Sequence, residues 1–97
     1  MASYILLASY TEQGIKSIKD TVKRTDAVKA MAKKVGLTMK ESYWTLGAYD
    51  VVAVFEAPDD ETMTAFSLSV AKLGNVKTQT LRAFSSKDMA GVLAKMV

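Results

Sequence analysis

Apolar and polar residues follow one another in short runs that predict strands and in longer periods that predict helices. Tyr4 to Tyr10 is a run of aromatic and branched residues, typical of a buried strand. Residues 37–45 and 49–57 are two more strand-like runs, and the short link between them contains Gly47, which permits a tight turn. These two runs therefore predict a β-hairpin.

The segment 15–36 has apolar residues at helical spacing, but the period slips by one residue between Val22 and Val28. It predicts either two helices, with Thr25 or Asp26 capping the second, or one distorted helix that ends at the final glycine of the segment.

Two further helices are predicted in the second half of the chain. The first begins at the acidic stretch after Pro58 and ends at Gly74, because carboxylates favour the N-terminal end of a helix and glycine its C-terminal end. Residues 76–84 predict a fourth strand. Ser85 and Asp88 then have the spacing of a capping box at the start of a short C-terminal helix.

The predicted order is strand, helix, strand, strand, helix, strand and tail helix, with no linker, so we expect one domain over residues 1–97. This α+β order is the ferredoxin-like βαββαβ arrangement, an antiparallel sheet with helices on one face. Right-handed crossovers place the strands 4–10 and 49–57 in the centre of the sheet. The other two strands interleave polar residues, as edge strands should.

Both faces of the central strands are apolar, whereas two helices can cover only one face. We expect the second face to be covered either by the short C-terminal helix or by the same face of another copy. Leaving a few hundred Å² of apolar surface in water would forgo several kcal/mol, at about 25 cal/mol per Å². We favour a homodimer, or a higher homo-oligomer, joined through its sheets.

Composition narrows the chemistry and the partners. The chain has no cysteine and no histidine, which excludes thiolate nucleophiles, Cys-rich zinc sites and the usual general base. We expect no metal and no cofactor, because the acidic residues 59–61 are explained by the start of a helix. No apolar run resembles a signal core or a membrane span, so we expect a cytoplasmic protein.

The net charge of +3 arises mainly from the segment 15–35, which carries seven Lys and Arg residues against two Asp residues. A solvated helix face is the favoured interpretation. Nucleic-acid binding is disfavoured, because no aromatic residues are interleaved with these charges.

The stretch 44–50 resembles the signature of the GYD-domain family, in which a glycine, a variable residue, tyrosine and aspartate recur, here from Gly47 to Asp50. The stretches 11–15, 56–61, 74–76 and 80–84 also resemble that family, so the resemblance spans residues 4–84. It implies a ferredoxin-like fold of the dimeric α/β barrel kind and no established activity. The wider superfamily includes monooxygenases, isomerases and haem-degrading enzymes that often rely on histidine.

Five residues are candidates for ligand binding: Tyr43, Trp44, Tyr49, Asp50 and Arg82. Tyr43 and Trp44 point to opposite faces of a strand, as do Tyr49 and Asp50, so neither pair can line one pocket. For the tyrosines and the tryptophan, packing in the sheet or the dimer is favoured over stacking on a planar ligand or bonding to one. Asp50 is expected to cap backbone amides after the turn.

Arg82 is the cation that the sequence most favours as partly buried, with a salt bridge to Glu41, Asp50 or Glu56 preferred over an anionic ligand. If a cavity exists, we expect it between sheet and helices or inside the dimer barrel. The residues expected to line it are Tyr10, either Tyr43 or Trp44, Tyr49, Phe55 and Arg82.

Two functions remain open from the sequence. The first is binding, or transformation, of a small, largely apolar or aromatic molecule in such a cavity. The alternative is a non-catalytic assembly or regulatory subunit that associates through its sheet face and takes no ligand. The sequence identifies no catalytic residue and does not decide whether the protein is an enzyme.

Overall fold

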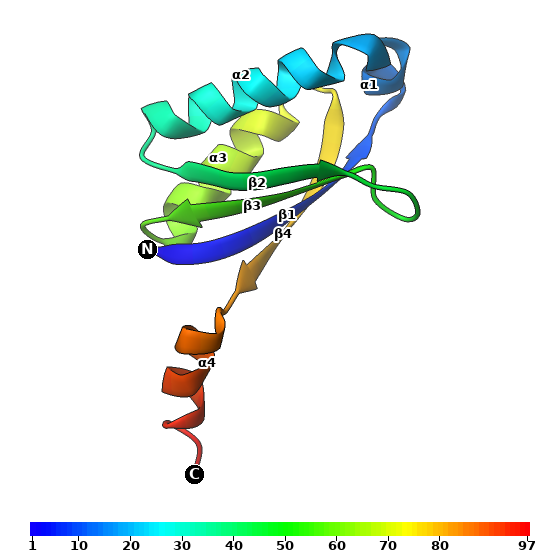
Figure 1. Ribbon diagram of the computed structural model, residues 1–97. Helices are drawn as coiled ribbons and strands as arrows, with labels where there is room; N and C mark the ends of the chain where they lie inside the picture. Colours follow the sequence, from blue (N-terminus) through cyan, green and yellow to red (C-terminus); the bar gives the residue numbers. More distant parts are fainter.

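The computed structural model, which describes residues 1–97, contains one four-stranded antiparallel sheet with two long helices on one of its faces (Figure 1). The strands are β1 (Ala2–Tyr10), β2 (Thr38–Trp44), β3 (Val51–Ala57) and β4 (Val76–Ala83). Their order in the sheet is β2-β3-β1-β4, so the two apolar strands lie in the centre. The ferredoxin-like α+β architecture predicted from the sequence is confirmed.

The helical elements are α1 (Glu12–Lys16), the 3₁₀ turn η1 (Ile18–Asp20), α2 (Thr21–Lys34), α3 (Asp60–Ala71) and α4 (Ser86–Leu93). Helices α2 and α3 cover the same face of the sheet (Figure 1). None of these helices combines the length and the apolarity that a membrane span requires.

The strand register decides which residues form the core. Tyr4 lies opposite Phe55 and Leu6 opposite Ala53, and these side chains are buried beneath the helices. Ile5 and the other residues that alternate with these core residues along the strands point to the other face of the sheet. No element of this chain covers that face. One face therefore forms the core and the other stays open.

The break in the first helical segment is not where the sequence predicts it. The period slip suggests a break near Thr25 and Asp26, but α2 runs continuously through both residues. The chain breaks earlier, at Ser17, between α1 and η1. The slip arises from counting Val22 as a core residue, although 57% of its surface is exposed.

Local signals at the other element ends are confirmed. Asp59 accepts a hydrogen bond from the Thr62 amide at 2.7 Å and caps α3. Ser85 and Asp88 form the capping box, each side chain bonded to the backbone amide of the other.

The hairpin link is longer than the three predicted residues, because β2 ends at Trp44 and β3 begins only at Val51.

Helix α4 extends away from the sheet and contributes no buried residue (Figure 1). The alternative in which this helix folds under the open sheet face of its own chain is therefore wrong. The projecting helix lengthens the molecule to 51 Å, and the radius of gyration is 14.5 Å. About 12.5 Å is expected for a compact chain of this length.

Candidate functional site

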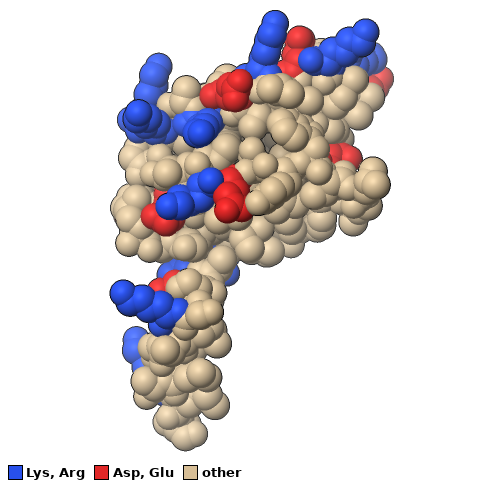
Figure 2. All heavy atoms as spheres, in the orientation of Figure 1, with Lys and Arg blue, Asp and Glu red and all other residues tan.

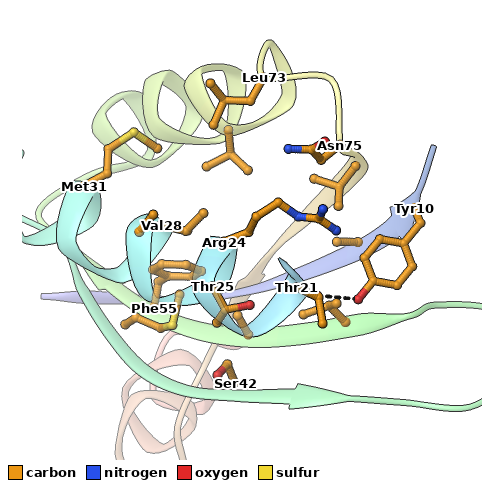
Figure 3. A pocket seen from close by; sticks show the side chains of 17 residues that line it. Tyr10, Thr21, Arg24, Thr25, Val28, Met31, Ser42, Phe55, Leu73 and Asn75 are labelled. Atoms are coloured by element: carbon orange, nitrogen blue, oxygen red, sulfur yellow. Dashed lines mark hydrogen bonds between the residues drawn. The ribbon is translucent and has the colours of Figure 1, made fainter. Parts of the chain in front are cut away.

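A cavity of about 190 Å³ lies between the sheet and the helices α2 and α3 (Figure 3). Most of its wall is apolar. The lining residues are Ala8, Tyr10, Thr21, Arg24, Thr25, Ala27, Val28, Met31, Met39, Ser42, Val51, Ala53, Phe55, Val70, Leu73, Asn75 and Val76. Along α2 the wall is only partly buried, and Ala27 is exposed, so a molecule can enter beside this helix.

Two hydroxyl groups meet at one end of the cavity. The Tyr10 hydroxyl lies 2.7 Å from Thr21 Oγ1, a contact drawn in Figure 3. Trp44 Nε1 donates to the same Thr21 oxygen at 3.1 Å. Because an indole N–H can only donate, Thr21 is the acceptor, and the first residue of α2 is thereby tied to β1 and β2.

Arg24 of α2 lies at the same end. In Figure 3 its side chain reaches across the cavity towards Tyr10 and Asn75. Its guanidinium donates to the carbonyl oxygens of Ser17 at 2.8 Å and Gly14 at 3.1 Å, which caps the C-terminal end of α1. Arg24 is thus half-buried and held in a fixed position.

None of the five residues proposed as ligand-binding from the sequence lines this cavity, whereas Tyr10 and Phe55 do. Trp44 contacts the wall through its bond to Thr21. Tyr43 lies opposite Val52 on the open face, and its hydroxyl donates to Glu41. That hydrogen bond raises the pKa of Tyr43 above its ordinary value. Tyr43 and Trp44 thus face opposite ways, as the strand period requires.

The Gly-x-Tyr-Asp stretch attaches the hairpin to its neighbours. The Asp50 carboxylate accepts the Tyr10 amide at 2.9 Å, and the Asp50 amide donates to the Ala8 carbonyl at 2.9 Å. Asp50, which precedes the first residue of β3, therefore extends the β1–β3 pairing. Its carboxylate accepts a backbone amide, but the amide belongs to β1 and not to the turn that the sequence suggested. The Tyr49 hydroxyl donates to Gln79 at 2.8 Å, and Gly47 has a φ of +110°.

Arg82 is exposed and forms no salt bridge with any of the three predicted carboxylates. Its guanidinium lies over the rings of Tyr4, at 5.5 Å, and Phe84, at 4.6 Å, and donates to backbone carbonyls. The predicted salt bridge is wrong: Arg82 lies near the end of an edge strand, and its guanidinium contacts aromatic faces and backbone carbonyls there.

Sequence reasoning missed Arg24 and Thr21, because both belong to a segment interpreted as a solvated basic face. One signal could have singled out the first of them. Arg24 is the only arginine among the seven cations of residues 15–35. The lysines of α2 are exposed, and Figure 2 shows cations gathered along this edge of the molecule.

The open face of the sheet is a second candidate surface. Its central side chains are Ile5, Leu7, Val52 and Val54, with Leu81 at the β4 edge. Helix α4 adds an apolar stripe that is also in water, formed by Met89, Val92 and Leu93, and Met96 follows beyond the end of the helix. Neither surface has a partner within this chain.

Comparison with known proteins shows the family of this chain and one of its relatives. The model of the GYD domain family matches residues 4–93. A protein of Thermus thermophilus, named "Glutamine synthetase and cystathionine beta-lyase binding protein", is 32% identical over 90 residues, which are 92% of this chain and 95% of that protein.

Two solved structures have similar folds. A feast or famine regulatory protein of M. tuberculosis, in complex with L-methionine, superposes with a TM-score of 0.67 at 10% identity, over 89% of this chain and 52% of that one. The protein FFRP-DM1 gives a TM-score of 0.64 at 19% identity, over 87% of this chain and all of that one.

Proposed function

This chain belongs to the GYD-domain family, and we propose that it is a binding protein that takes a small, largely apolar or aromatic molecule into the cavity beneath α2 and α3. The observation that carries this proposal is the cavity itself, which is apolar along most of its wall and has a few polar groups gathered at one end. Binding sites for small molecules commonly combine these two features.

The size of the cavity suggests the size of the ligand. An apolar cavity of about 150 Å³ stays dry and binds benzene. A cavity of about 190 Å³ has room for one such ring with a short substituent. The wall offers no thiol and no imidazole, so its chemistry favours binding over a covalent reaction.

Titration of the ¹⁵N-labelled protein with benzyl alcohol tests the proposal by NMR. We expect saturable shifts at residues of the cavity wall, such as Val28, Met31 and Val51, and none on the open face. The variant Ala53→Leu should lose these shifts, because the larger side chain fills the cavity floor from β3.

The matched control is Ala30→Leu, which adds the same side chain at an exposed position of α2 that does not line the cavity. This variant should bind benzyl alcohol like the wild type. Shifts spread over the whole surface, or equal binding by Ala53→Leu with an unchanged fold, would contradict the proposal.

A second candidate function, association with proteins through the open face, is supported by a different observation. The accessible surface is 6633 Å², whereas about 5,400 Å² is expected for a folded monomer of 10.5 kDa. The excess of about 1,200 Å² is enough for a standard interface, which takes about 800 Å² from each partner. The simplest way to cover the open face of the sheet is with the same face of a second copy, so we propose a homodimer.

The name of the Thermus relative suggests that association could extend to other proteins. That protein is named for binding two enzymes, and this chain matches nearly its whole length. A ligand in the cavity and a partner on the open face are compatible, because the sheet separates the two surfaces. A small regulatory subunit would use both.

A further inference from the structure

Arg24 places a positive charge at the polar end of a mostly apolar cavity, and no carboxylate forms an ion pair with it. Its two hydrogen-bond partners are the backbone carbonyls of Gly14 and Ser17, which carry no net charge. The two ion pairs of the molecule both involve lysines. A half-buried cation beside apolar surface is costly unless an anion accompanies it.

The two carbonyls fix the position of the guanidinium without using up its donors. A guanidinium has five N–H donors, and the bonds to Gly14 and Ser17 occupy two of them. The Arg24 Cζ atom also lies 6.0 Å from the centre of the Tyr10 ring. The charge is therefore held ready beside the cavity, with donors to spare.

Other groups at this end also favour an acceptor. Asn75 Oδ1 already accepts from Gln13 Nε2 at 3.0 Å, which leaves the Nδ2 hydrogens of Asn75 to donate. Thr21 begins α2, and Asp20 makes no side-chain cap there. The positive end of the helix dipole thus lies at the same end of the cavity as Arg24.

We infer that the molecule bound in this cavity is a small carboxylic acid in its anionic form, with an apolar body the size of a benzene ring. Its carboxylate accepts hydrogen bonds from Arg24, whose planar fork suits two carboxylate oxygens. Its ring lies against Val28, Met31 and Phe55. This inference rests on the proposed function, since it assigns the chemical class of the ligand to the same cavity.

A matched pair of probes tests the charge of the ligand. Phenylacetate and phenylacetamide have nearly the same shape, and only the first is an anion. We expect the wild-type protein to bind phenylacetate about tenfold more tightly than phenylacetamide, as measured by NMR titration at low salt. In Arg24→Gln the ratio should fall close to one, through loss of phenylacetate affinity alone.

The control variant is Arg82→Gln. Arg82 also lies over aromatic rings, but outside the cavity, so its loss should leave both affinities unchanged. Should Arg24→Gln fail to fold, Arg24→Lys keeps the charge but loses the fork. An unchanged preference for phenylacetate in Arg24→Lys would then overturn the role of the two-pronged contact.

The outcomes separate this inference from the proposed function. Equal binding of the two probes by the wild type, with saturable binding of benzyl alcohol, overturns the carboxylate inference and leaves the binding function standing. Binding of none of the three probes overturns both. If Arg82→Gln lost as much phenylacetate affinity as Arg24→Gln, the anion would be assigned to another surface and the inference overturned.

Discussion

At the scale of single residues, Tyr4 links the core to the start of α3. Its ring is 3% exposed, and its hydroxyl donates to the Asp60 carboxylate. Burial, followed by this hydrogen bond, raises the pKa of Tyr4 to about 12. The hydroxyl therefore stays protonated in the folded chain at a pH at which the unfolded chain loses the proton.

The raised pKa predicts a loss of stability in alkali. Below pH 10 Tyr4 is protonated in both states and its contribution is complete. Between pH 10 and about 12 only the unfolded state releases the proton, so the free energy of unfolding falls as pH rises. Tyr4→Phe should cost about 1 kcal/mol at pH 7 and make the alkaline decline shallower, as measured by urea unfolding. Parallel declines in the two proteins would contradict this.

At the scale of elements, the short helix α1 clamps the loop between α3 and β4. The Thr11 amide donates to the Asn75 carbonyl at 3.1 Å, and the Thr11 hydroxyl to the Gly74 carbonyl at 2.6 Å. Gly14 faces the same loop so closely that a Cβ atom would lie 2.1 Å from the Asn75 oxygen. The close approach of two backbones is what requires glycine here.

Gly14→Ala should therefore destabilise the protein by about 1–3 kcal/mol, although alanine is the better helix former. Thermal or urea unfolding measures the change. Gly91→Ala in α4 is the matched control, because nothing lies within 4 Å of the added Cβ. The control should leave the free energy of unfolding the same or raise it by up to about 1 kcal/mol. If Gly14→Ala were more stable than the wild type, the loop at Asn75 would have moved away from the added Cβ, and the close approach would not require glycine.

At the scale of the whole molecule, one sheet separates two surfaces of different kinds. The face beneath the helices encloses the core and the cavity, and the open face includes Leu81 of β4, the strand that precedes α4. Few residues of the chain are buried, 14 of 97, which leaves the single copy short of core. In the proposed homodimer, a second copy would bury additional apolar residues of the open face.

The proposed homodimer predicts which substitutions dissociate it. Leu81→Glu on the open face and Val92→Glu on α4 should each shift the protein towards monomer in sedimentation velocity at micromolar concentration, because a charge would be buried. Leu68→Glu places the same charge on the outer side of α3, at a residue that is 66% exposed, and should leave the dimer intact. A wild-type monomer at these concentrations, or equal effects of all three variants, would contradict the proposal.

Prediction from the sequence succeeded where the signal is local. The caps at Asp59 and Ser85 depend on residues three apart. Prediction failed where distant segments meet. The break before α2 depends on Arg24 reaching back to α1, and the aromatic neighbours of Arg82 come partly from β1.

The sequence by itself determined the element order, the central strands and the surplus of apolar surface, because side-chain periodicity and turn residues act over a few positions. Only the tertiary structure decided that the cavity lies beneath α2, that Arg24 faces it, and that α4 leaves its own sheet open. A cavity is the space left when helices and strands of fixed shape pack together. Its place and its lining therefore depend on the angles and contacts between elements, which no local pattern records.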